Sequence, residues 1–469
     1  MNTYIKTLVT IITIGILGGC KVSKDIPLPK TTIPEHFRNA EIKDSSSIGN
    51  RAIADFFPEK ELKNLIDTAL IRNYDLQIAV KNLESTSQLL KQAKLGNVPQ
   101  LNLQITGSSN SPSDNSLNGL SASEFLKTSH IEDFNANLGL TWEADIWGKI
   151  KSQKQEALAT YLQTDEARKA VQTQLIASIA QGYYRLLMMD AQITIARKNL
   201  KLSDSTLNIV KLQFDAGQVS SLAVQQAKAQ QLVSAQLIPK LQQDITVQEN
   251  ALSMLTGHVP GAIERSKSLE ETFVSEKPSA GYPSAMVSKR PDVKSAELSL
   301  TIANARVGVA KASMYPSINI TATGGLNSFK ASNWFNIPAS LFGVVAGGIT
   351  QPLLQKRQLK TQYELAKIDR EKAVIKFRQS VLNAVTEVSD ELVKIEKLKE
   401  QYDISKEKVN TLQQAVKNAN LLFTGGMATY LEIITAQSNS LQSELELTAI
   451  KTAQLNAAVE LYRTLGGGL

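Results

Sequence analysis

Phe214-Asp-Ala-Gly217 returns later in the chain as Phe423-Thr-Gly-Gly426, at an offset of 423 − 214 = 209 residues. Upstream of both segments, apolar or small residues recur at alternating intervals of three and four, which is the seam of helices that pack as coiled coils. These seam residues are Ile193, Ala196, Leu200, Ser203, Leu207 and Val210, then Tyr402, Ser405, Val409, Leu412, Val416 and Ala419. A repeat of this length predicts two similar structural units.

Each unit is expected to hold a long helical hairpin, because a second seam follows each glycine turn. The predicted tips lie at about 214–219 and 423–428. The helices before them, from about 150 to 213 and from about 354 to 422, would each be about 100 Å long. Pro239 should cost about 3 kcal/mol inside a helix, so we expect it to separate two stacked shorter helices.

Four segments of alternating apolar and polar residues precede the hairpins, at about 99–110, 133–143, 315–326 and 341–351. In the last of them the alternating residues are Phe342, Val344, Ala346 and Gly348. Their length suits tilted transmembrane β-strands, and the alternative is a half-buried soluble sheet. The turn-rich segments 108–123 and 327–336 are expected to be outward loops. Trp142 and Trp147 suit a membrane-interface girdle, although buried structural tryptophans would fit as well.

Four strands cannot span a membrane alone, since the unpaired backbone groups of two sheet edges would cost several kcal/mol each in lipid. Other copies of the chain must therefore close the barrel. Eight strands is about the bacterial minimum, which requires two or more protomers and leaves the choice between two and three open.

The amino terminus predicts a lipoprotein signal peptide over residues 1–19. Lys6 precedes a short apolar run that ends in Leu17-Gly-Gly-Cys20, and this run is too short to span a bilayer. Cys20 would then carry covalent N-acyl and S-diacylglycerol lipid, with residues 20–58 as a tether. Lys21, where an aspartate would favour retention at the inner membrane, favours the outer membrane. A plain secretory signal with a chance cysteine is the alternative.

Composition and motifs give no support for an enzyme. Lys and Arg number 51 against 44 Asp and Glu, without the basic tracts and interleaved aromatics that nucleic-acid binding needs. His36, His130 and His258 have no zinc-site spacing, and no glycine-rich phosphate loop follows a strand. The single cysteine is assigned to lipid, so we expect no metal and no other cofactor.

The chain resembles the outer-membrane factor, or TolC-like, family from about Leu62 to Gly467, and most closely the lipoprotein branch that serves resistance-nodulation-division efflux pumps. The segments that carry the resemblance are Lys289-Arg-Pro-Asp-Val-Lys-Ser-Ala-Glu297, Ala303-Asn-Ala-Arg-Val-Gly-Val-Ala-Lys311, Tyr315-Pro-Ser317, Trp142-Glu-Ala-Asp-Ile-Trp-Gly148 and the two Phe-x-x-Gly turns.

This resemblance implies a mainly α fold with a β-barrel portion, built from structural repeats at 59–257 and 284–467 around a linker or equatorial segment at 258–283. Three protomers would form a twelve-stranded transmembrane barrel on an α-helical periplasmic tunnel. The implied function is export of drugs or toxic compounds, with a periplasmic adaptor (membrane fusion) protein and an inner-membrane pump as partners. The sequence of this chain does not identify the transported substrate, because in such systems specificity resides largely in the inner-membrane pump.

The resemblance also implies roles for particular residues. The residues of the two tips would meet the adaptor: Phe214, Gly217, Phe423, Gly425 and Gly426. The alternative for each glycine is that it only supplies the positive φ needed where one helix ends and the next begins. Leu431, Glu432 and Thr435 would narrow the tunnel. Thr435 and Ala223 stand where acidic residues are common in the family, which leaves Glu432 as the candidate charged ring or as an ordinary solvated charge.

Two other functions remain open at this point. One is a TolC-like duct for protein secretion with an ABC exporter, against which the lipoprotein signal and the Arg290-Pro-Asp tract favour small-molecule efflux. The other is a structural coiled-coil tether between outer membrane and cell wall, which has no use for paired strands.

Overall fold

The computed structural model describes residues 37, 47–272, 281, 283, 286 and 289–468, which form two compact units. One unit contains Ser85–Tyr161 and Leu298–Ile375, and the other contains the described residues of Lys30–Glu84, Leu162–Glu297 and Lys376–Leu469. Each unit draws on both sequence repeats. The predicted signal peptide, Cys20, His36 and most of the tether lie outside the described residues.

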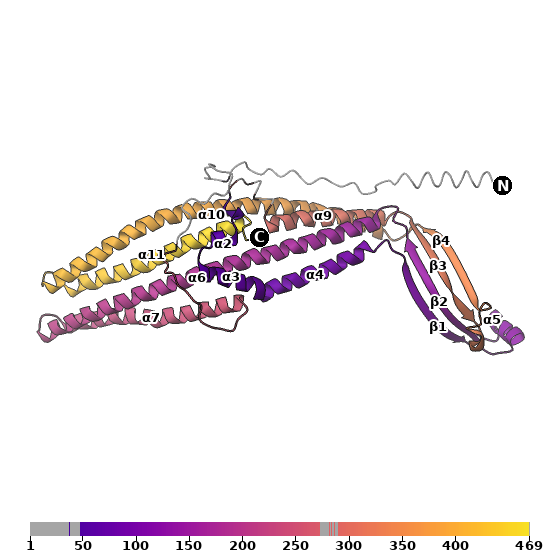
Figure 1. Cartoon of the computed structure of the whole chain (residues 1–469), viewed down its shortest axis with the longest axis horizontal. Coiled ribbons are helices and arrows are strands. Elements are labelled where there is room, and N and C mark those ends of the chain that lie inside the picture. Colours follow the sequence, from indigo (N-terminus) through magenta and orange to yellow (C-terminus); the bar gives the residue numbers. More distant parts are fainter. Residues whose placement is uncertain are drawn as a thin grey trace. The chain divides into compact units, whose positions relative to one another are not determined.

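The first unit contains a four-stranded antiparallel sheet in the order β1-β2-β3-β4 (Figure 1). The strands are β1 (Gln100–Asn110), β2 (Ile131–Glu143), β3 (Ser317–Ser328) and β4 (Leu341–Thr350). They confirm the four strands predicted from alternation. Because β2 pairs with β3, the two sequence repeats are joined into one sheet.

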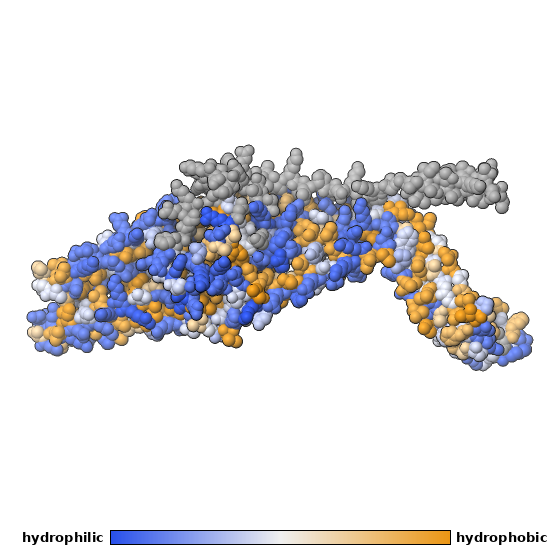
Figure 2. Space-filling model, viewed as in Figure 1, coloured by the Kyte–Doolittle hydropathy of each residue, from blue (hydrophilic) through white to orange (hydrophobic). Residues whose placement is uncertain are grey.

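The register gives the sheet one apolar and one polar face. Leu103 faces Leu138, whereas the next pair along the strands is Gln104 with Asn137. Side chains alternate between faces, so these two pairs belong to opposite faces. Figure 2 shows apolar residues gathered over the strands and polar residues over much of the visible helical surface.

Strand β4 departs from the predicted alternation. Phe342 and Val344 lie opposite Gly325 and Thr323, and therefore join the polar face together with Ala346 and Gly348. The apolar face receives Leu341 and Val345 instead. The reason is that β4 is apolar or glycine at almost every position, so alternation cannot choose its face and pairing with β3 decides.

The segment predicted as the first loop, 108–123, contains more structure than expected. β1 continues to Asn110, and a short helix α5 (Leu117–Ser121) is followed by a helical turn η2 (Ala122–Leu126). Ser116 is the N-cap of α5, because its Oγ accepts a 3.0 Å hydrogen bond from the Gly119 N–H. The second loop contains one short turn, η3 (Ala331–Asn333).

Helices make up most of the rest of the described chain. The first hairpin consists of α6 (Lys149–Asp215) and α7 (Ser221–Leu255), and the second of α10 (Gln358–Thr424) and α11 (Tyr430–Thr464). α6 and α10 have 67 residues each, which is about 100 Å of helix, as predicted. The shorter elements are η1 (Ile48–Asn50), α2 (Ile53–Phe56), α3 (Lys60–Arg72), α4 (Tyr74–Lys94) and α9 (Pro291–Ala312).

Among the described residues, none of the helices combines the length and the hydropathy needed to cross a bilayer.

The main apolar core of the second unit lies where α3, α6, α7 and the end of α11 meet. It contains the fully buried Tyr183 and Leu186 of α6 and Tyr462 of α11.

Pro239 does not divide the helix in which it lies, so the predicted break is wrong. α7 runs without interruption from Ser221 to Leu255. Leu237 and Ile238 before the proline and Leu241 after it pack in one apolar cluster with Ile193 and Ala196 of α6. Packing on both sides of the proline therefore outweighs the roughly 3 kcal/mol that an interior proline costs.

Candidate functional site: the hairpin tips and the Arg290 hollow

The tip of the first hairpin, residues 214–219, is a tight helix-ending turn. The Gly217 N–H donates to the Phe214 carbonyl at 2.9 Å, and the Gln218 N–H donates to the Gln213 carbonyl at 2.8 Å. These two bonds together are the Schellman motif, which needs a left-handed residue. Gly217 supplies it with φ 72°.

The tip of the second hairpin, residues 423–428, repeats this geometry. The Gly426 N–H donates to the Phe423 carbonyl at 3.1 Å, and the Met427 N–H donates to the Leu422 carbonyl at 2.8 Å. Gly426 also has φ 72°. The turn requirement predicted for the two glycines is thus confirmed, since a side chain at either position would be strained.

Gly425 has a weaker requirement than its neighbour. A Cβ at this position would lie 3.3 Å from the Leu421 carbonyl oxygen and 3.4 Å from Met427 Cε, and the second of these atoms ends a flexible side chain. The first tip has Ala216 at the equivalent position. The backbone of the turn therefore tolerates a methyl group there.

The two repeated phenylalanines have different surroundings, although they occupy the same position in the repeat. Phe214 is 43% exposed and Phe423 only 3%. Phe423 belongs to an apolar cluster with Val210, Ala223 and Ile433, which come from both hairpins. The hairpins pack against each other, so the same seam position faces the neighbouring hairpin in one copy and solvent in the other.

The predicted constriction residues lie on the first two turns of α11 and are all exposed: Leu431, Glu432 and Thr435. The carboxylate of Glu432 accepts a hydrogen bond from the backbone N–H of Thr429, as part of a capping box at the start of α11. Ala223, at the corresponding position of the first hairpin, is fully buried. A charge there would be desolvated, so this position suits a small apolar residue.

Hydrogen bonds that the sequence did not predict join the two hairpins. At the tips, the Tyr430 hydroxyl donates to Gln226 Oε1 at 2.7 Å. Between the same two hairpins, Gln437 Nε2 of α11 donates to Thr206 Oγ1 of α6 at 2.8 Å, and both residues are buried. Of these four residues only Thr206 and Gln437 are buried, and neither is among the seam residues of the repeat, so the sequence carried no signal for these contacts.

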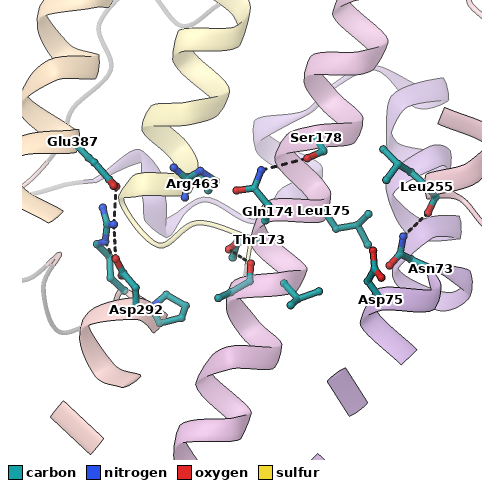
Figure 3. A pocket seen from close by; sticks show the side chains of 14 residues that line it. Asn73, Asp75, Thr173, Gln174, Leu175, Ser178, Leu255, Asp292, Glu387 and Arg463 are labelled. Carbon is teal, nitrogen blue, oxygen red and sulfur yellow. Dashed lines mark hydrogen bonds and ion pairs between the residues drawn. The ribbon is translucent and has the colours of Figure 1, made fainter. Parts of the chain in front are cut away.

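Arg290, from the Lys289-Arg-Pro-Asp tract, lines a hollow of about 600 Å³ in the second unit (Figure 3). Its side chain is 5% exposed and makes ion pairs of 2.7 Å with both Asp292 and Glu387. Its Nη1 donates to the Thr464 carbonyl at 3.1 Å. The guanidinium thereby ties the start of α9 to α10 and to the end of α11.

The ion pairs keep Arg290 and Asp292 in their charged forms. Burial acts to lower the pKa of Arg290, but its hydrogen bonds and ion pairs with the two carboxylates outweigh burial and raise it. For Asp292 burial acts to raise the pKa, and the bonds from Arg290 lower it overall. Arg290, Asp292 and Glu387 are committed to one another, so this part of the hollow is a structural clamp.

The described histidines have local partners. His258 Nε2 lies 2.9 Å from Arg72 Nη1, and its Nδ1 lies 3.2 Å from Thr256 Oγ1. His130 Nε2 lies 3.7 Å from Glu132. Within the described part of the chain, no three His, Cys, Asp or Glu side chains are grouped so that they could hold a metal ion.

The chain matches a known protein family and is similar to proteins of efflux systems. The model of the outer membrane efflux protein family matches residues 65–258 and 282–467. The cation efflux system protein CusC of Escherichia coli is 27% identical over 456 residues, covering 96% of this chain and 97% of that protein. The toluene efflux pump outer membrane protein TtgC of Pseudomonas putida is 28% identical over 474 residues, covering 97% of this chain and 94% of that protein.

Solved structures agree with the fold. A crystal structure of CusC has a TM-score of 0.85 and 26% sequence identity, and the match covers 96% of this chain and all of that one (100%). The open state of the MtrE outer membrane channel of Neisseria gonorrhoeae has a TM-score of 0.85 and 25% identity, with 96% and 99% covered.

Proposed function

Since this chain belongs to the outer membrane efflux protein family, it serves efflux at the outer membrane, and we propose that three copies of it form the channel of a tripartite pump. The family match confirms the resemblance found in the sequence. The proposal adds the trimer, its closed barrel and the residues that meet the other components.

The observation that carries this proposal is the open four-stranded sheet. Within the described residues, β1 and β4 each pair on one side only. In lipid the free edge of each strand would leave backbone groups unpaired, at several kcal/mol per group. In a sheet of alternating direction, β4 runs opposite to β1, so β4 of one copy can pair antiparallel with β1 of the next.

Three copies would give a closed barrel of twelve strands, which lies within the range of bacterial outer-membrane barrels. The apolar face with Leu103 and Leu138 would meet lipid, and the face with Gln104 and Asn137 would line the channel. This arrangement pairs the backbone N–H and C=O groups of both sheet edges. It also places the apolar face in lipid and the polar face in water.

The hairpin tips suit a protein partner. Leu212 and Phe214 of the first tip, and Leu421 and Met427 of the second, are all exposed. Clustered exposed apolar side chains on a soluble surface mark contact sites. We assign this surface to the periplasmic adaptor, and the adaptor in turn would connect the channel to an inner-membrane pump of the resistance-nodulation-division type.

Just above the tips, Leu431, Glu432 and Thr435 of three copies would form the narrowest rings of the tunnel. Three Glu432 carboxylates close to one axis would attract cations and repel one another, so contacts that spread the tips would favour opening. The capping bond from Thr429 would hold each carboxylate near its own helix start. At the other end of the chain, acylated Cys20 would anchor the protein in the membrane.

The cargo class is small toxic molecules. One relative is named for cation efflux and another for toluene efflux, so the relatives do not fix a single compound. A pure tether is a poor alternative, because the sheet and its polar face would have no role in it.

The test is deletion of the gene in its host, followed by growth on a panel of antibiotics, dyes, solvents and metal salts. The proposal predicts increased susceptibility to several compounds, restored by the wild-type gene. A matched complementing variant, Cys20→Ala, should restore less, because the lipid anchor is lost. Unchanged growth on every compound, with the protein present in the outer membrane of the parent strain, would contradict the proposal.

A further inference from the structure

An aromatic cluster lies at the end of the sheet where loops join β1 to β2 and β3 to β4. The Phe134 and Trp334 ring centroids are 5.5 Å apart, and those of Trp334 and Phe335 are 5.1 Å apart. The indole of Trp334 is held in place by its N–H, which donates to the Leu326 carbonyl at 3.4 Å. Trp334 and Phe335 belong to the loop between β3 and β4, residues 329–340.

This cluster continues the apolar face of the sheet. Phe134 alternates in step with Leu138 along β2, and Leu326 is paired with Leu341 on the same face. Trp334 packs on the last residues of that face, so the loop extends the surface that would meet lipid.

The position of the cluster matches the boundary of a membrane. Phe134 and Trp142 stand on the same face of β2 and are eight residues apart, or about 27 Å along the strand. A strand tilt of about 40° reduces this to ~21 Å across the membrane, close to the ~25 Å apolar band of outer-membrane barrels. With Trp142 at one edge of this band, Trp334 reaches the other edge.

The loop has the composition of an interface segment. Phe335 is 70% exposed, and Phe329 is exposed as well. Lys330 is the only charged residue of the loop, and its ammonium lies 5.8 Å from the centre of the Phe329 ring. Aromatic rings beside one lysine fit a layer of lipid headgroups, where apolar and phosphate groups are found together.

We propose that the loop 329–340 docks into the headgroup layer on the loop side of the membrane, with Trp334, Phe335 and Phe329 as anchors and Lys330 against the phosphate of anionic lipid. The inference rests on the proposed barrel. It adds a lipid-binding surface that fixes the depth of the barrel and gives it a preference for anionic lipid.

The experiment measures the depth of a single tryptophan in vesicles. Trp142→Phe combined with Trp147→Phe leaves Trp334 alone, and Trp147→Phe combined with Trp334→Phe leaves Trp142 as the matched control. Each variant is reconstituted into phosphatidylcholine brominated either near the headgroup or near the chain end. We expect shallow bromines to quench Trp334 more strongly than deep ones.

The Trp142 control distinguishes a failure of loop docking from a failure of the proposed barrel. Quenching of Trp142 together with a Trp334 that responds only to aqueous acrylamide would overturn the docking inference and leave the barrel intact. If neither tryptophan is quenched by any brominated lipid, the barrel proposal itself fails.

A charge variant tests the headgroup contact. Adding phosphatidylglycerol should reduce acrylamide access to Trp334 about twofold when Lys330 is present, since one lysine near an anionic surface contributes a modest attraction. Lys330→Gln should abolish the reduction. An equal reduction in both proteins would overturn the role of Lys330.

A labelling measurement keeps the inference testable if the double variants do not assemble. Ser332→Cys in the otherwise wild-type chain, labelled with an environment-sensitive dye, should report an apolar surrounding in vesicles. Ser205→Cys on α6 is the aqueous control. Identical aqueous emission from both positions would contradict docking.

Discussion

The tip of the first hairpin and the tip of the second make the same pair of backbone hydrogen bonds but bury different side chains. Gly217 and Gly426 have the same φ of 72°, whereas Phe214 is exposed and Phe423 is buried. Glu432 caps α11, and the equivalent position of α7 is the buried Ala223. The repeat has preserved the turn but divided the tasks of the two phenylalanines: Phe423 packs the hairpins together, and Phe214 stays largely in solvent.

The largest expected difference between the tips follows from the two phenylalanines. Phe423→Ala removes a buried ring from the shared cluster and should destabilise the tips by about 3–5 kcal/mol. Phe214→Ala, the matched control, should cost about 1 kcal/mol or less because the ring is largely solvated. Hydrogen exchange of the tip amides in the purified protein measures both, and equal effects would contradict the division of tasks.

The turn glycines should respond alike. Gly217→Ala and Gly426→Ala each place a Cβ in the left-handed region, at a cost of about 1–2 kcal/mol. Gly425→Ala should cost clearly less, because the first tip already has Ala216 at that position. Exchange rates of the amides at each turn provide the comparison, and a larger effect from Gly425→Ala than from Gly426→Ala would refute the assignment.

The cap on α11 predicts an effect in one hairpin only. Glu432→Ala removes the acceptor for the Thr429 N–H and should destabilise the first turn of α11 by about 1 kcal/mol. Glu432→Gln keeps an oxygen acceptor and should lose less. If Glu432 also forms the proposed ring, both variants reduce cation selectivity of the channel. Unchanged selectivity in both would leave Glu432 with the capping role alone.

The smallest effect is expected from the bond between the tips. Tyr430→Phe removes the hydroxyl that donates to Gln226 and should weaken the packing of the two tips against each other by about 0.5–1.5 kcal/mol. Single-channel recordings should then show a higher open fraction. Gln226→Ala should have the same effect, and adding it to Tyr430→Phe should change nothing further. Fully additive effects would show that the two residues do not act through this bond.

Much of the fold was predictable because its elements are long and periodic. Alternation identified the strands, and heptad spacing with glycine turns identified both hairpins. The face of β4 was not predictable, since its residues are apolar on both sides and only pairing with β3 decides. Pro239 stays helical because of contacts with α6, and such contacts leave no local signal.

The site was predictable where backbone geometry requires a residue type. Gly217 and Gly426 were identified because a left-handed turn favours glycine. The different exposure of Phe214 and Phe423 depends on which hairpin lies beside each ring. The repeated sequence does not show this packing. Arg290 was noticed as part of a recognisable tract, but its partner Glu387 is 97 residues away and became apparent only in the fold.

The most direct measurement of the central claim is the mass and conductance of the purified, lipidated protein. The proposed trimer, closed through β1 and β4, predicts a particle of three chains in detergent, which produces discrete current steps when added to a planar bilayer. A single chain with no current, in a preparation whose circular dichroism shows both helix and strand, would contradict it.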